Sequence, residues 1–208
     1  MKTAIKLSAA ILVMVMSACS SDDSKETIEE PLSERLEYEF TTLTEIPNGT
    51  GDLATVTVNV DEDRIVIDPT KVFIEFTLDH YEAKDLTYGY VIPNDNNTYR
   101  SLVRNLGGSN NYEAQNVLSF NPNHTTVINA DGNYPNNSIP QGNYKEGSLS
   151  PTAAIDTPLF ANMMNKNING TWKFFVEDYQ DNWNLIDDGN IVKIKLIFDE
   201  GALEVTNN

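Results

Sequence analysis

Short runs of alternating apolar and polar residues dominate the chain from residue 41 onward. The alternation is clearest in the segments ATVTVNV, KVFIEFTL, TWKFFVED and IVKIKLIF. Successive side chains of a strand point to opposite faces, so the apolar half of each segment is expected to face a core. These apolar positions are Val56, Val58, Val60, Val72, Ile74, Phe76, Leu78, Trp172, Phe174, Val176, Ile191, Ile194, Leu196 and Phe198. The pattern predicts strands, and helical periodicity is almost absent.

The segments between these runs are rich in turn-forming residues. Asn, Gly, Asp and Pro separate the expected strands, and Asn and Gly are frequent between residues 107 and 152. Long connections of that kind are tolerated at the ends of a β-sandwich. An internal repeat of roughly 20 to 50 residues, as in solenoids and propellers, is not seen. We therefore expect one all-β, antiparallel β-sandwich.

The first eighteen residues form a separate segment. Lys2 and Lys6 precede the apolar run LSAAILVMVM, which is too short to remain as a membrane-spanning helix. This pattern is typical of an export signal, expected over residues 1–18. The sequence Met16-Ser17-Ala18-Cys19, which contains the single cysteine, resembles the lipobox of bacterial lipoproteins. The resemblance implies that the Cys19 thiol is lipidated and that lipid anchors the mature chain.

An acidic, polar stretch follows the cysteine. SSDDSKETIEEP contains no aromatic residue and is expected to act as a tether over residues 19–40. Its Ser/Asp cluster also resembles the tag by which some Gram-negative bacteria display lipoproteins at the cell surface. We therefore expect an outer-membrane lipoprotein, facing either the periplasm or the outside. The sandwich is expected over residues 41–200 and a C-terminal tail over 201–208.

The formal net charge of -17 restricts the partners of the chain. Such a charge repels nucleic-acid phosphates and anionic lipid surfaces at long range. Nucleic acid is therefore not an expected partner, and the membrane is expected to be reached through lipid rather than through charge.

Several motifs occur in the order found in one known domain family. EIPNGTG precedes TVTV, and IEFTLDHYEAKDLTYGYVIP places His80 five residues before Asp85. Gly170-Thr171-Trp172 opens a later strand, and Asp187-x-Gly189 precedes the last one. Together these motifs resemble the P (Homo B) domain that follows the catalytic domain in proprotein convertases and some bacterial subtilisin-like proteases. The resemblance covers about residues 44 to 198 and implies a jelly-roll-like, galactose-binding-like sandwich.

Two positions depart from the pattern of that family. Lys84 stands where the family usually has Gly, and Ile194 stands where it usually has Trp. The first departure loosens the match of the turn after His80. The second replaces one large residue of the expected core.

The sequence does not favour an enzyme. Between Cys19 and the expected sandwich there is no room for the Ser-His-Asp domain of a convertase. Only His80 and His124 could act as imidazole bases, and neither lies near a Gly-flanked serine. His80, at a strand end, is better explained as a structural histidine. We expect no catalytic residue in the chain.

A binding or assembly module at the envelope is the function that these features favour. Its partner would be a protein or a glycan. One alternative is a detached accessory domain of a subtilisin-like serine endopeptidase, which the P-domain resemblance suggests. Another alternative is a carbohydrate-binding module.

Acidic residues crowd the segment NGTWKFFVEDYQDNWNLIDDG. Carboxylates this close repel one another unless water or a cation separates them, and Ca²⁺ prefers such oxygen ligands. Calcium is therefore a candidate cofactor, with plain solvated turns as the alternative. The candidate ligands are Asp85, Asp178, Asp187 and Asp188.

Two aromatic residues, Tyr179 and Trp183, lie within the same acidic segment. Exposed aromatic side chains commonly stack on sugar rings or anchor a protein partner. Both are candidate ligand-binding residues. The alternative is that they fold back onto the end of the sandwich.

Overall fold

The computed structural model describes residues 34–48, 52–81, 86–104, 110–128, 133–146, 148–149, 159–179 and 189–206, all within the unit Leu32–Asn208. These residues form strands and three short 3-10 helices, so the all-β prediction is confirmed. The 3-10 helices are η1 (Pro69–Lys71), η3 (Pro135–Asn137) and η4 (Phe160–Met163). In this part of the chain, no helix has the length and apolar character needed to cross a membrane.

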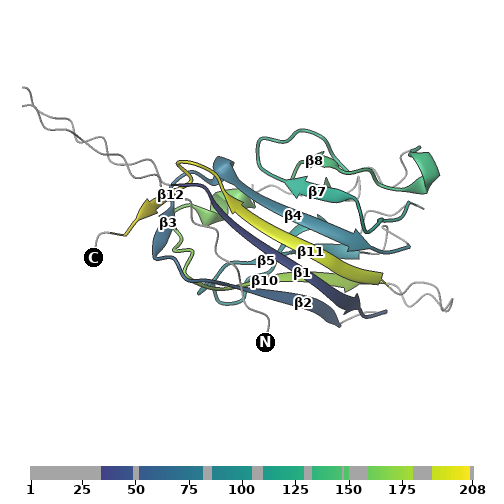
Figure 1. Ribbon diagram of the computed structural model, residues 1–208, viewed down its shortest axis with the longest axis horizontal. Coiled ribbons are helices and arrows are strands. Elements are labelled where there is room, and N and C mark those ends of the chain that lie inside the picture. Colours follow the sequence, from purple (N-terminus) through teal and green to yellow (C-terminus); the bar gives the residue numbers. More distant parts are fainter. Residues whose placement is uncertain are drawn as a thin grey trace, which may run out of the picture. The chain divides into compact units, whose positions relative to one another are not determined.

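Two five-stranded sheets contain most of the strands (Figure 1). The first sheet has the order β1 (Leu36–Ile46), β11 (Gly189–Phe198), β4 (Val72–Asp79), β7 (Val117–Phe120) and β8 (Gly142–Tyr144). The second has the order β2 (Leu53–Val60), β10 (Gly170–Asp178), β5 (Leu86–Val91), β6 (Arg100–Arg104) and β9 (Ser148–Leu149). The short strands β8 and β9 pair in parallel with β7 and β6, and all other neighbours are antiparallel. A small third sheet joins β3 (Arg64–Val66) to β12 (Leu203–Val205).

The strand order is that of a jelly roll. Without the short edge strands, the first sheet reads β1-β11-β4-β7 and the second reads β2-β10-β5-β6. Most connections therefore cross from one sheet to the other, and the first and last long strands, β1 and β11, lie side by side. Two interlocked Greek keys produce this arrangement. The predicted antiparallel, jelly-roll-like β-sandwich is confirmed.

The core lies between the two sheets and contains every apolar position predicted from the alternation. Aromatic side chains join the sheets: the Phe76 ring meets the Phe174 ring at 6.1 Å between centroids, and the Trp172 ring meets the Phe198 ring at 5.9 Å. Both contacts are edge-to-face, a favoured geometry for aromatic pairs. Burial of one such side chain stabilises the fold by roughly 1.5–3 kcal/mol.

A β-bulge explains why the apolar pattern of β11 skips a step. Ile191 faces Leu78 of β4 and Lys193 faces Thr77, so Val192 is an extra residue relative to β4. The bulge reverses the alternation after Ile191, and Ile194 is therefore buried instead of Lys193. The irregular spacing in the sequence thus corresponds to a break in strand register.

The first strand begins earlier than the sequence predicted. β1 starts at Leu36, inside the stretch expected to be tether, and alternates half-buried and exposed residues up to Ile46. Its glutamates Glu37 and Glu39 lie against lysines of β11: Lys195 pairs with Glu37, and the Lys193 amine lies 3.4 Å from Glu39. At the other end, β12 lies within the expected tail. These ion pairs stabilise β1 in a stretch that the sequence analysis placed before the first strand.

Candidate functional site

His80 and Asp178 form a buried pair between two segments of the P-domain-like pattern. His80 follows β4 and Asp178 ends β10; the His80 Nε2 lies 3.4 Å from the Asp178 Oδ2, and both side chains are 1% exposed. Gly189 makes room for the imidazole, because a Cβ there would lie 2.3 Å from the His80 Cδ2. The backbone of His80 also exchanges two hydrogen bonds with Tyr112. This environment suits a structural histidine.

Of the four candidate calcium ligands, the structure describes only Asp178. Asp85, Asp187 and Asp188 lie outside the described residues. Asp178 is buried against His80 rather than exposed at a turn. Within the described ranges, no cluster of three or more His, Cys, Asp or Glu side chains is suited to a metal ion. The calcium site at Asp85, Asp178, Asp187 and Asp188 stays a prediction.

Of the other predicted site residues, only Tyr179 is described. Cys19 and Trp183 both lie outside the described residues. Tyr179 directly follows β10 and keeps 36% of its surface exposed. It lines a depression on the outer face of the second sheet.

We call this feature the sheet-face depression. Its volume is about 350 Å³, and its lining includes Thr87, Tyr99, Arg104, Phe175, Glu177 and Tyr179. β10, β5 and β6 contribute most of these residues, Tyr99 comes from the β5–β6 connection, and Leu53 of β2 and Ser101 of β6 complete the lining. β10 and β5 are hydrogen-bonded to a neighbour on each side, which fixes the backbone under most of this surface.

A row of residues crosses the second sheet at the centre of the depression. Glu177 of β10 pairs with Thr87 of β5, and Thr87 pairs with Arg104 of β6. Residues paired across neighbouring strands share one face of the sheet, so a carboxylate, a hydroxyl and a guanidinium lie side by side. Leu53 of β2 pairs with Glu177 and extends the row at its acidic end.

Thr87 is the unusual member of this row. Only 3% of its surface is exposed, and among the described residues its Oγ1 has no hydrogen-bond partner. A buried hydroxyl without a partner costs stability, on the order of 1–3 kcal/mol. Native proteins satisfy nearly all such groups, and a ligand oxygen is one way to satisfy this one.

Tyr99 lines the depression from the β5–β6 connection and is supported from beneath. Its ring packs edge-to-face on Phe175, with centroids 5.0 Å apart, yet 54% of the residue is exposed. Phe175 itself is 2% exposed and serves as the floor. The two exposed tyrosines thus border a polar row over an aromatic base.

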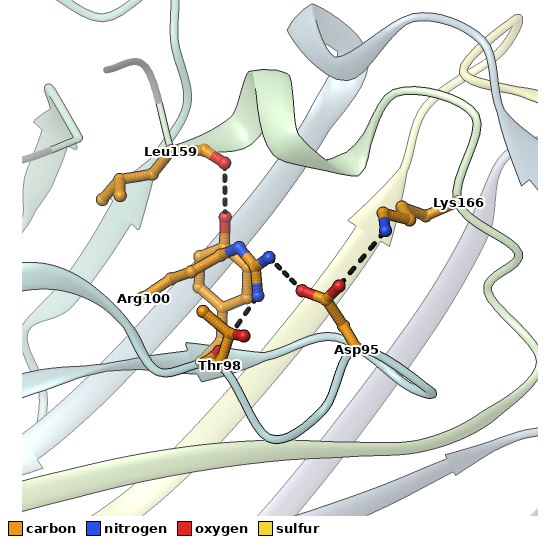
Figure 2. Close-up of polar contacts among 6 residues, drawn as sticks. Asp95, Thr98, Arg100, Leu159 and Lys166 are labelled. Atoms are coloured by element: carbon orange, nitrogen blue, oxygen red, sulfur yellow. Dashed lines mark hydrogen bonds and ion pairs between the residues drawn. The ribbon is translucent and has the colours of Figure 1, made fainter. Parts of the chain in front are cut away.

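The β5–β6 connection that carries Tyr99 is fixed by an ion-pair network (Figure 2). Arg100 and Lys166 contact the Asp95 carboxylate from two sides, the Lys166 Nζ at 3.1 Å, and the Arg100 Nη1 donates to the Thr98 carbonyl at 3.0 Å. The hydrogen bond from Arg100 holds the pKa of Asp95 below its usual value, and Lys166 acts in the same direction. The carboxylate therefore stays charged, and the network remains intact well below neutral pH.

Three left-handed asparagines shape the same connection. Asn94, Asn96 and Asn97 all have φ between +49° and +58°, a conformation that Asn tolerates better than most residues. The Lys173 Nζ donates to the Asn97 Oδ1 at 2.9 Å and attaches the connection to β10. Gly89 lets β6 approach closely, because a Cβ there would lie 1.9 Å from the Arg100 carbonyl oxygen.

Charges at the depression act on Tyr179. Burial raises the pKa of the Tyr179 phenol, the Glu177 carboxylate raises it further, and Arg104 acts in the opposite direction. The phenol is therefore protonated at neutral pH and can donate a hydrogen bond. With Glu177 as acceptor and Arg104 as donor, the depression offers both kinds of partner at one place.

Tyr179 was proposed from the sequence as a candidate ligand-binding residue, and the other residues of the depression were not. Thr87, Tyr99 and Arg104 carry no local motif, and they are separated from Tyr179 by the long chain that crosses to the other sheet and back. The register of β5 between β10 and β6 brings them together. The one available signal was Tyr99, an aromatic residue within an Asn-rich turn.

Comparisons with known proteins add little to this picture. No family model and no curated protein matches the chain. Among solved structures, the serine protease of Aeromonas sobria is similar with a TM-score of 0.46 and 12% identity, over 82% of this chain and 28% of that one. The complex of that protease with its chaperone ORF2 gives a TM-score of 0.42 and 11% identity, over 83% and 28%. At these values the two likenesses do not decide what the chain does.

Proposed function

We propose that the chain is a lipid-anchored, non-catalytic binding module of the outer membrane, and that its ligand contacts the sheet-face depression. The observation that carries this proposal is the pair of exposed tyrosines beside a charged row and a buried hydroxyl without a partner. Exposed aromatic side chains on a rigid surface contribute contact area at a low cost in conformational entropy.

The surroundings of the two histidines support a non-catalytic role. His80 is 2% exposed and faces Asp178, so a substrate in solvent does not reach its imidazole. The Nδ1 of His124 lies 3.2 Å from the carbonyl oxygens of Ser119 in β7 and Tyr144 in β8. This ring nitrogen therefore helps to hold the two strands together. Turnover that depends on either imidazole would contradict this assignment.

The membrane anchor in this proposal rests on the segment Met16–Cys19 of the sequence. Replacement of Cys19 by Ser should release the chain from membranes or leave its signal segment uncleaved, as shown by fractionation and mass spectrometry. An unchanged, lipid-modified membrane fraction would refute the anchor. Protease treatment of intact cells separates the surface from the periplasmic leaflet, because only a surface-displayed chain is cleaved.

Binding through the depression can be tested with the full chain purified in detergent and immobilised. Labelled envelope extract should bind the unmodified chain, and Tyr99→Ala or Tyr179→Ala should reduce the bound fraction by about tenfold. Tyr81→Ala is the matched control, because Tyr81 is 59% exposed but does not line the depression. Equal binding by all three variants would show that the ligand contacts another surface.

A second candidate is an accessory role for a separate subtilisin-like catalytic subunit. It is favoured by the P-domain resemblance together with the buried contact of His80 and Asp178, which belong to two different motifs of that pattern. A pull-down from the native envelope should then recover a serine protease at stoichiometric amounts. If that recovery is unaffected by Tyr99→Ala, the protease uses another surface and the two roles are separable.

Calcium binding by the acidic segment is a further part of the proposal. The candidate ligands are Asp85, Asp178, Asp187 and Asp188, and Asp178 also lies against His80. A ligand that binds only the folded chain at about 100 times its Kd stabilises it by roughly 2.7 kcal/mol. We expect millimolar calcium to raise the melting temperature above its value in EDTA, magnesium to do less, and Asp187→Ala to abolish the shift. Coincident melting curves would leave these residues as solvated turns.

A further inference from the structure

We propose that the sheet-face depression binds an uncharged carbohydrate chain, an assignment that rests on the binding function proposed above. Four observations support this class of ligand over peptides and anions. They concern the backbone of the strands beneath the depression, the charges of its central row, its exposed rings and its hydroxyl groups.

The backbone of β10 and β5, which lie beneath most of the depression, is hydrogen-bonded on both sides within the sheet. β5 is hydrogen-bonded to β10 on one side and to β6 on the other, and β10 is hydrogen-bonded to β2 and β5. A peptide that adds a strand needs a free sheet edge to bond its main chain. Recognition over β10 and β5 must therefore use side chains, and that suits a ligand whose polar groups are its own hydroxyls.

The charges of the central row favour a neutral ligand. Glu177 and Arg104 flank Thr87 and balance each other, so the depression presents no net charge. The whole chain carries -17, which disfavours uronic acids and phosphorylated glycans by long-range repulsion. Each of the two charged side chains can still bond a neutral hydroxyl, which donates to the carboxylate and accepts from the guanidinium.

The rings and hydroxyls fit the two kinds of surface that a sugar has. A pyranose ring presents C–H groups on its faces, which pack on aromatic rings, and hydroxyls around its rim. Tyr99 and Tyr179 are exposed by 54% and 36% and supply the rings. Between them the Thr87 hydroxyl has no partner among the described residues, and Ser101 adds a second hydroxyl. A bound sugar oxygen would complete the hydrogen bonding of Thr87.

The test is calorimetric titration of the full chain in detergent with neutral gluco-, manno-, galacto- and xylo-oligosaccharides, with polygalacturonate as the anionic comparison. At least one neutral series should bind, and polygalacturonate should not. Tyr99→Ala should weaken binding about tenfold or more, and Tyr81→Ala should not change it.

Thr87→Val separates a ligand-binding role from a structural one. The substitution keeps the shape of the side chain and removes the hydroxyl, so it should weaken sugar binding several-fold without lowering the melting temperature. A lowered melting temperature together with unchanged affinity would show that the hydroxyl serves the fold, and would remove Thr87 from the site.

Periodate and protease treatments separate failure of this inference from failure of the binding function. If capture of envelope extract survives periodate but not protease, and no neutral oligosaccharide binds, the ligand is a protein and the carbohydrate assignment is wrong while the binding function stands. If no extract is captured at all, both are wrong. Capture that periodate abolishes and protease leaves intact supports both.

Discussion

Trp172 lies at the centre of the aromatic core. Its ring stacks on Phe174 at 6.5 Å and meets Phe198 edge-on, and its Nε1 donates to the Ile168 carbonyl at 3.0 Å. Trp172→Ala should therefore lower the free energy of unfolding by about 3–5 kcal/mol, measured by urea denaturation. Leu43→Ala is the control, because Leu43 is 79% exposed and its loss should cost about 0.5 kcal/mol or less. Similar costs for both would mean that Trp172 is not packed as described.

The His80–Asp178 pair predicts strong coupling between two residues. Removal of one partner leaves the other buried, which typically costs about 3–5 kcal/mol, so Asp178→Asn and His80→Gln should each be strongly destabilising. The double variant should cost clearly less than the sum, as measured by a double-mutant cycle in urea. Additive costs would show that the two side chains do not interact. EDTA throughout removes any contribution from calcium.

At the residue scale, the sequence predicted the core better than the site. Val72, Ile74, Phe76 and Leu78 obey a period of two because they are neighbours on one strand, and burial acts on each strand separately. Thr87, Arg104 and Glu177 share a face only through the register of three strands. Register depends on the whole sheet, so no local pattern revealed that row.

The β5–β6 connection is the element that places Tyr99. Asp95→Ala removes the acceptor shared by Arg100 and Lys166 and leaves the Arg100 guanidinium, 8% exposed, with Thr98 as its remaining described partner. We expect a loss of about 1.5–3 kcal/mol in the free energy of unfolding, since the lost hydrogen bonds involve charged groups. Ligand affinity should fall as well, because Tyr99 would no longer be held on Phe175. Asp61→Ala, at an exposed acidic position, is a suitable control; unchanged stability in Asp95→Ala would refute the role of the network.

The N-terminal half of β1 shows why one element was misjudged from the sequence. Glu37 and Glu39 alternate with Leu36, Tyr38 and Phe40, but the sandwich was expected to begin only at residue 41. Lys193 and Lys195 of β11 neutralise these glutamates, but they are about 150 residues away in the chain. The lysines that compensate the charges of Glu37 and Glu39 come from a distant strand, so residues 36–40 alone do not show that this strand is stable.

Buried tyrosines should determine the behaviour of the whole molecule at high pH. Burial raises the pKa of both Tyr38 and Tyr144 to about 12 and raises the pKa of Tyr88, Tyr90 and Tyr112 still further. An unfolded tyrosine ionises near pH 10, so the folded chain holds these protons more tightly. This stabilisation is complete below about pH 10 and is lost as the pH rises from there toward 12.

Urea denaturation at pH 9, 10 and 11 checks this prediction, and the free energy of unfolding should fall across the series. Tyr144→Phe should reduce the slope of that fall, because it removes one of the groups with a raised pKa. A free energy that stays constant to pH 11 would contradict the burial of these phenols.

At the scale of the whole fold, the class was predictable and the strand order was not. The alternation of apolar and polar residues shows that each strand turns one face to the core, and this is sufficient to predict a β-sandwich. The jelly-roll order was reached only through the P-domain resemblance, because periodicity does not say which strands are neighbours. β11 lies between β1 and β4, and β10 lies between β2 and β5, so two late strands are inserted between early ones. No local sequence pattern indicates these insertions.

The position of β2 at the end of its sheet has a consequence for association. Its eight residues, LATVTVNV, carry no charge, no proline and no bulge, whereas β1, at the edge of the other sheet, has glutamates and an irregular register. No other described strand is hydrogen-bonded to the outer side of β2. Glutamates and bulges are the usual protection against edge-to-edge aggregation, and β2 lacks both. At high local concentration, two copies of the chain would therefore meet through this long edge, because nothing in the sequence of β2 opposes pairing between its copies.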